Sequence, residues 1–139
     1  MLDLQRAKAE LEKISCTCAL CRGNELLTTS LRGVAPLLSF LDSKKDFNGF
    51  SAADKVVGKG AAFLYVLLGV RAVYAAVISE SALEVLQRAD ISVTYDTLTP
   101  YIKNRTGESR CPIEWAVLDA NDATTALPLI RAKLEALKK

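Results

Sequence analysis

The chain has 139 residues, 50% of them hydrophobic and 24% charged, a balance typical of one globular domain over residues 1–139. Eighteen basic and sixteen acidic residues leave a net charge of +2 without a basic stripe, which argues against a nucleic-acid partner. Charged residues directly after Met1, and Gly69 and Arg71 inside the most apolar stretch, argue against a secretory signal and a membrane partner and predict a cytoplasmic protein.

The first half of the chain predicts helices around a hairpin. Apolar residues recur at helical spacing near the N-terminus, and Arg22, Gly23 and Asn24 form a turn signal between two apolar runs. Ser51 is placed to cap a long helix that Gly69 ends. The predicted elements, in chain order, are a helix over 2–14, hairpin strands over 16–21 and 25–31, a short helix over 37–41 and a helix over 52–68.

The second half alternates strands and helices. The near-continuous apolar run over 72–78 is typical of a strand buried on both faces, and the polar segment 97–110 is long enough to suggest a functional loop. The predicted elements are strands over 72–78 and 91–95 and helices over 80–89, 112–118 and 122–139. This order predicts an α/β fold in which an N-terminal hairpin and parallel strands form a mixed sheet flanked by helices.

Five stretches together resemble the family catalogued as domain of unknown function 1893. They are Thr17-Cys18, Arg32 to Leu38, Gly49 to Lys59, Asn104 to Thr106 and Cys111 to Glu114. The part from Ser51 to Lys55 is the most specific. The resemblance implies a three-layer cytidine deaminase-like fold, and it implies no particular activity.

Cytidine deaminases hold zinc with His-x-Glu at one helix start and Pro-Cys-x-x-Cys at the next. We expect the corresponding places here at Ser51 to Lys55 and at Ser79 to Ala82, which contain neither histidine nor cysteine. The chain has 0 histidines. We therefore expect no metal, no cofactor and no hydrolytic deamination.

Four cysteines match the ligand count of a structural zinc site, but their spacing does not. On a strand Cys16 and Cys18 face one way and Cys21 the other, and Cys111 is remote in sequence. The interpretation favoured here is that these thiols act as small core hydrophobes.

Polar residues at two predicted helix starts and in the long loop form the candidate site. Helix starts at the carboxyl ends of parallel strands favour anions. Lys55 in a first turn opposes the helix dipole, so it needs Asp54 or a ligand as its partner. Capping by Ser51 and Ser79 is the alternative. The ligand-binding candidates are Ser51, Ser79, Glu80, Ser81, Asn104 and Arg105, and the catalytic candidates are Cys111, Lys55 and Asp54.

Three functions stay open at this point. The leading hypothesis is a domain that binds a small anionic, nucleotide-like metabolite between the two helix starts and the loop. The second is an enzyme that uses Cys111 as a nucleophile or redox thiol, with Lys55 or a carboxylate as its base. The third is a non-catalytic structural or regulatory protein. The sequence does not decide whether the chain is an enzyme, and it leaves a homo-oligomer open.

Overall fold

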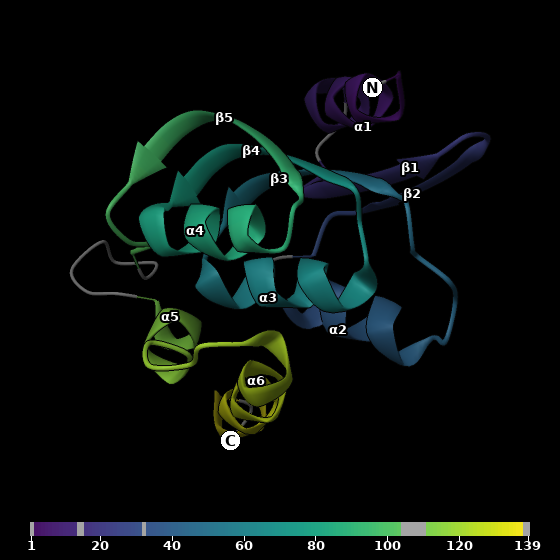
Figure 1. The fold of residues 1–139 in the computed structure, drawn as a ribbon. Helices are drawn as coiled ribbons and strands as arrows, with labels where there is room; N and C mark the ends of the chain where they lie inside the picture. The colour runs from purple at the N-terminus through teal and green to yellow at the C-terminus, as the bar shows by residue number, and fades with distance from the viewer. Residues whose placement is uncertain (1, 14–15, 32, 104–110, 138–139) are drawn as a thin grey trace.

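The structure is a computed structural model, and it describes residues 2–13, 16–31, 33–103 and 111–137. Helices and strands alternate along most of the chain (Figure 1). The elements are α1 (Leu2–Lys13), β1 (Cys18–Arg22), β2 (Glu25–Thr29), α2 (Ala35–Asp42), β3 (Ser51–Val57), α3 (Lys59–Leu68), β4 (Ala72–Ser79), α4 (Glu80–Arg88), β5 (Ser92–Thr99), α5 (Pro112–Ala116) and α6 (Ala123–Leu137).

The strands form one five-stranded mixed sheet in the order β2-β1-β3-β4-β5. Strand β1 is antiparallel to β2 and β3, whereas β3, β4 and β5 are parallel. Right-handed crossovers place α3 and α4 on one face, α1 covers part of the other, and α5 and α6 lie beyond α3 (Figure 1). The predicted α/β class and mixed sheet are confirmed.

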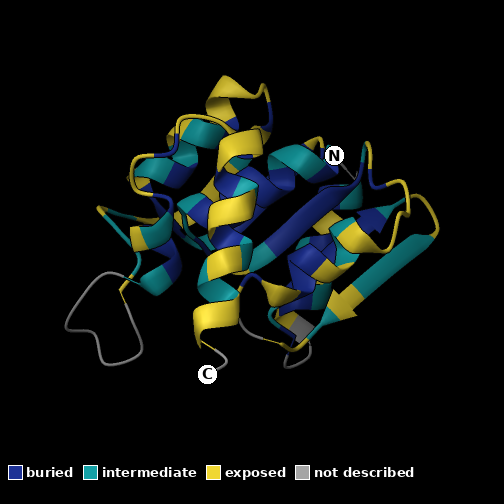
Figure 2. Cartoon of the chain, turned by 90° about the horizontal axis from the view of Figure 1, so that it is seen from below, coloured by how far each residue is buried: buried dark blue, intermediate teal, exposed yellow. Residues whose placement is uncertain are grey.

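Two apolar cores hold these layers together. The main core lies between the sheet and α2, α3 and α4 and includes the fully buried Leu64, Ile78 and Leu86. A smaller core lies under α1, where Leu4 and Leu11 pack against the sheet. Figure 2 shows that α6, which leads to the C-terminus, keeps an exposed outer side. No helix in the described part of the chain has the length and hydrophobicity needed to cross a bilayer.

The prediction of a helix over 52–68 is wrong in its first third. Residues Ser51–Val57 form strand β3, and α3 begins only at Lys59, with Gly58 at its N-cap. Alanine and lysine favour helices in isolation, but pairing with β1 on one side and β4 on the other outweighs that preference. Strand β5 also extends to Thr99, so the start of the predicted polar loop belongs to the sheet.

The parallel ladder is irregular near the carboxyl ends of its strands. Asp54 pairs with Ala75 and the next recorded pair is Val56 with Val77. On β4 the residues that face the main core are Val73, Ala75 and Ile78. Their spacing therefore changes from two residues to three at this point, as it does at a β-bulge. Val56, on β3 at the same level, is 47% exposed.

Candidate functional site

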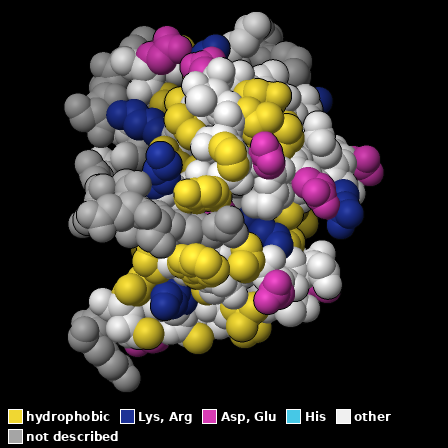
Figure 3. Space-filling view, turned by 90° about the vertical axis from the view of Figure 1, so that its left-hand side faces the viewer, with side chains coloured by type: hydrophobic (Ala, Val, Ile, Leu, Met, Phe, Trp, Pro, Cys, Tyr) yellow, Lys and Arg dark blue, Asp and Glu magenta, His cyan; other side chains and the backbone are white. Residues whose placement is uncertain are grey.

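The carboxyl edge of the parallel strands carries two helix starts side by side. Val57 pairs with Ile78, and Ser79 pairs with Thr99, so the three strands end together. Helices α3 and α4 follow directly and pack against each other. Figure 3 looks onto this edge, where hydrophobic side chains gather in an upper and a lower group. Such an edge is where α/β domains usually bind ligands.

At the start of α4, Ser79 acts as a cap. It is completely buried, and its Oγ accepts the N–H of Ala82 at 3.2 Å. Ser81 Oγ lies 3.4 Å from Ser79 Oγ. The exposed Glu80 occupies the first turn, where its charge complements the dipole. Ser79 is therefore a helix cap, which is the alternative to ligand binding given above. Ser81 is half-buried and lines the groove described below.

At the start of α3, the chain supplies its own anion. Glu114 of α5 is 4% exposed, and its Oε1 accepts the backbone N–H of Lys59 at 2.6 Å. A Cβ on Gly58 would lie 2.4 Å from this oxygen, and a Cβ on Gly60 would lie 2.5 Å from Ile113 Cγ2. Both glycines thus permit α5 to sit against α3, and Glu114 caps a helix 55 residues earlier in the chain.

Lys59, and not Lys55 as predicted from the sequence, is the lysine in the first turn of α3. Its Nζ donates to the carbonyl of Leu118 at 2.9 Å and lies 5.8 Å from the ring centroid of Phe63. Within the described residues it forms no ion pair with a carboxylate. Because α3 begins at Lys59, this lysine is the one whose charge opposes the helix dipole.

A groove of about 270 Å³ separates α3 and α4 from the connection between α5 and α6. Glu84 pairs with Arg88 at 3.0 Å, and Asp122 Oδ1 caps α6 by accepting the N–H of Thr125 at 2.7 Å. That hydrogen bond lowers the pKa of Asp122. The polar lining of the groove consists of Lys59, Ser81, Glu84, Arg88, Asn121 and Asp122. Its apolar lining consists of Phe63, Val66, Val85, Ala89, Ala120 and Ala123.

The structure does not place Ser51, Asp54 and Lys55 at a helix start, and that part of the prediction is wrong. Ser51 pairs with Ala72, seven residues before Ser79, so about 23 Å of strand separates Ser51 from the carboxyl edge. Lys55 is exposed on β3. The candidates Asn104 and Arg105 lie outside the described residues.

Asp54 belongs instead to a polar cluster in the main core. Its Oδ2 accepts the Tyr65 hydroxyl at 2.6 Å, and the same hydroxyl lies 3.2 Å from the sulfur of Cys18, the cross-strand neighbour of Asp54. Burial raises the pKa of Asp54 to about 6, against the opposing effect of the Tyr65 hydrogen bond. Burial also raises the pKa of the Cys18 thiol. Burial thus disfavours the charged forms of both groups, and neither Tyr65 nor Cys18 was expected beside Asp54.

The sheet separates the cysteines. Cys18 lies in the main core, whereas Cys16 and Cys21 lie under α1, so the prediction that Cys16 faces the same way as Cys18 is wrong. Within the described residues, no group of three or more His, Cys, Asp or Glu is placed to hold a metal ion. Cys111 is half-buried before α5, and in the part of the chain described here no hydrogen bond joins its thiol to a lysine or a carboxylate.

These features define an α/β domain with a mixed five-stranded sheet and a groove next to two helix starts. The family described as "Domain of unknown function (DUF1893)" matches residues 6–134, and the chain belongs to it. This confirms the resemblance seen in the sequence.

Two solved structures are similar to this chain. A DUF1893 family protein from Thermotoga maritima is 26% identical, with a TM-score of 0.83 over 98% of this chain and 91% of that chain. A dCMP deaminase from the cyanophage S-TIM5 is 11% identical, with a TM-score of 0.44 over 70% of this chain and 94% of that chain. A search of curated proteins gave no match.

Proposed function

We propose that the domain binds a small anionic metabolite in the groove between α3, α4 and the connection from α5 to α6. One observation carries the proposal: Lys59, a cation in the first turn of α3, opens to the same groove as Ser81 in the first turn of α4. Because a cation opposes the dipole of its own helix, a negatively charged ligand beside Lys59 would remove an unfavourable interaction. Lys59 takes the role predicted for Lys55, and Ser81 is kept from the predicted set.

The groove suits a ligand with one anionic group and an apolar body. Lys59 and the N–H groups in the first turn of α4 would bind a phosphate or carboxylate. The exposed pair of Arg88 with Glu84 contributes little to stability, about 0–1 kcal/mol, so Arg88 can exchange Glu84 for the ligand. The apolar floor would contact a ring, and the exposed Asn121 amide could bind its polar edge. A mononucleotide has all of these parts.

The experiment is an NMR titration of the labelled protein with inorganic phosphate, a nucleoside monophosphate and the corresponding neutral nucleoside. We expect the monophosphate to shift the amide signals of Ser81 and Asn121 and to bind more tightly than the nucleoside. Lys59→Gln should weaken monophosphate binding about tenfold or more, because a hydrogen bond to a charged group contributes about 1.5–3 kcal/mol.

Lys55→Gln is the matched control, since it removes an exposed lysine from the same region of the chain without touching the groove. It should leave the affinity unchanged. Equal affinity for nucleoside and monophosphate, or equal losses in the two lysine variants, would refute the anion site. The two glutamines leave the chain with the same net charge, so a general electrostatic effect cannot separate them.

A further inference from the structure

Strand β5 forms one edge of the sheet. It is the last strand in the sheet order, and within the described residues no strand pairs with its outer side. It is eight residues long, and six of them are exposed. Such an edge presents a row of backbone N–H and C=O groups that can pair with another strand.

The opposite edge is protected, and β5 is not. Strand β2 has five residues, and its Glu25 is paired with Arg22 at 3.0 Å and Lys45 at 2.5 Å. Short length and charge are the usual means of preventing edge pairing. Strand β5 contains no lysine, arginine or proline.

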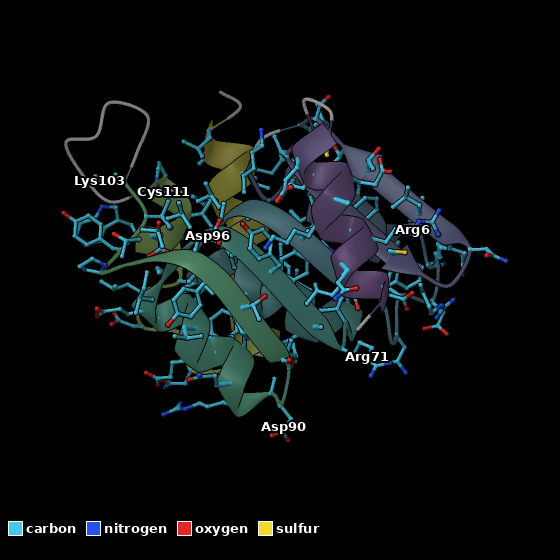
Figure 4. The ribbon with its side chains drawn as sticks, turned by 90° about the horizontal axis from the view of Figure 1, so that it is seen from above. Arg6, Arg71, Asp90, Asp96, Lys103 and Cys111 are labelled. Atoms are coloured by element: carbon cyan, nitrogen blue, oxygen red, sulfur yellow. The ribbon has the colours of Figure 1, made fainter. Side chains whose placement is uncertain are left out.

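The one charge on β5 is turned away from the edge. Asp96 accepts a hydrogen bond from the hydroxyl of Tyr74 on the neighbouring strand β4, at 2.5 Å. Figure 4 shows Asp96 above the sheet, on the side that carries α1. Meanwhile Tyr95 and Leu98 are 41% and 42% exposed. The edge therefore offers backbone groups and apolar side chains without a repelling charge.

Helix α4 continues this surface beneath β5. Its residues Ser81, Glu84, Val85 and Arg88 line the groove, and Ala82 and Leu86 are buried. The remaining side consists of Glu80, Leu83 and Gln87, which share one face of the helix at spacings of three and four. Glu80 carries the one charge on this side of α4, and Leu83 is partly buried against the main core.

We propose that β5 pairs antiparallel with β5 of a second copy of this chain, so that one continuous sheet crosses a two-fold dimer. A two-fold interface needs only one surface that complements itself. Pairing centred on Tyr95 places Thr94 opposite Asp96 of the second copy, whereas pairing centred on Asp96 would oppose two like charges. Of these two registers, the one with Tyr95 at the axis is therefore favoured. The proposal is independent of the ligand in the groove.

The test is sedimentation velocity over a dilution series, with hydrogen exchange of the β5 amides at the two ends of the series. We expect a dimer that dissociates on dilution, with β5 amides that lose protection as it does so. Tyr95→Lys should raise the dimer dissociation constant more than about tenfold, because two lysines would then face each other across the axis. Thr28→Lys on the protected edge strand β2 is the control and should leave the constant unchanged.

A far-ultraviolet spectrum equal to that of the unmodified protein and a cooperative thermal transition establish that Tyr95→Lys is folded, since loss of the dimer alone lowers the thermal midpoint. If that variant is unfolded, Leu98→Lys replaces it. Its lysine would lie opposite Ser92 of the second copy, and it should still raise the dissociation constant, because a lysine on an edge strand disfavours edge pairing. A protein that is monomeric throughout the dilution series overturns the proposal. So does a dimer whose dissociation constant is the same in the folded edge variant. A monomer that binds a different protein along β5 overturns it as well.

Discussion

Replacing Gly58 by alanine tests whether Glu114 is lodged against the start of α3. The backbone of Gly58 has φ −94° and ψ 179°, which any residue adopts, so alanine adds no backbone strain. The new Cβ would lie 2.4 Å from Glu114 Oε1 and 3.1 Å from Ile102 Cγ1. Because the carboxylate is buried and bonded to the N–H of Lys59, it cannot move aside without losing that bond.

The cost has two parts. Losing a hydrogen bond to a charged group costs about 1.5–3 kcal/mol, and overpacking at Ile102 costs about 1 kcal/mol or more. Alanine recovers about 0.4–1 kcal/mol by restricting the unfolded chain. The free energy of unfolding should therefore fall by about 2–4 kcal/mol in Gly58→Ala, measured by urea denaturation with the slope unchanged.

The double variant Gly58→Ala/Glu114→Ala isolates the contact. In the absence of the Glu114 carboxylate, the added methyl group meets only Ile102, so Gly58→Ala should cost about 1 kcal/mol or less there. Gly23→Ala is the control, since no atom lies within 4 Å of its added Cβ and its cost arises from its φ of +59°. That cost should add to the Glu114→Ala cost. If Gly58→Ala costs the same with and without Glu114, the cap described here does not exist.

Two further predictions concern buried groups. Because the pKa of Asp54 is raised to about 6 from 3.8, its ionisation disfavours the folded state, so this carboxyl lowers stability as pH rises from about 4 through 6. Asp54→Asn keeps an acceptor for Tyr65 and should be about 1–3 kcal/mol more stable than the unmodified protein at pH 8. Thermal melts at pH 8 and pH 4 should show that this difference in stability is smaller at pH 4. A difference that does not change with pH would contradict the prediction. In the folded protein, iodoacetamide should label Cys111 alone, as counted by intact mass. The three buried cysteines, Cys16, Cys18 and Cys21, should react only in denaturant. Labelling of Cys18 in the folded protein would contradict its place in the main core.

The sequence predicts the strands and helices that carry clear local signals, and it fails at β3. The hairpin turn at Gly23 and the apolar run of β4 are visible in short windows. Strand β3 is not, since Ala52 to Lys55 favour a helix and the pairing that outweighs them comes from distant residues. The signals that could have corrected the boundary were the β-branched Val56 and Val57 followed by Gly58.

The sequence predicts where the candidate site lies in the fold, but it does not predict all of the residues that form it. That two helix starts share a sheet edge follows from the order of elements, and Ser79 and Ser81 were assigned to that edge correctly. The cap by Glu114 joins positions 55 residues apart, and no local window contains it. Its only local trace is the pair of glycines around Lys59, which marks a place where another part of the chain comes close.

Because the start of α3 was predicted too early in the chain, Lys55 rather than Lys59 was assigned to its first turn. A first-turn lysine opposes the dipole wherever the helix begins, so the argument made for Lys55 holds for Lys59 once α3 starts at the correct residue. The N–H of Lys59 is already bound to Glu114, whereas its ammonium donates to the carbonyl of Leu118 and forms no ion pair with a carboxylate among the described residues. The proposed anion would therefore lie beside the Lys59 ammonium and the first turn of α4, on the groove side of α3, rather than on the helix axis that Glu114 fills.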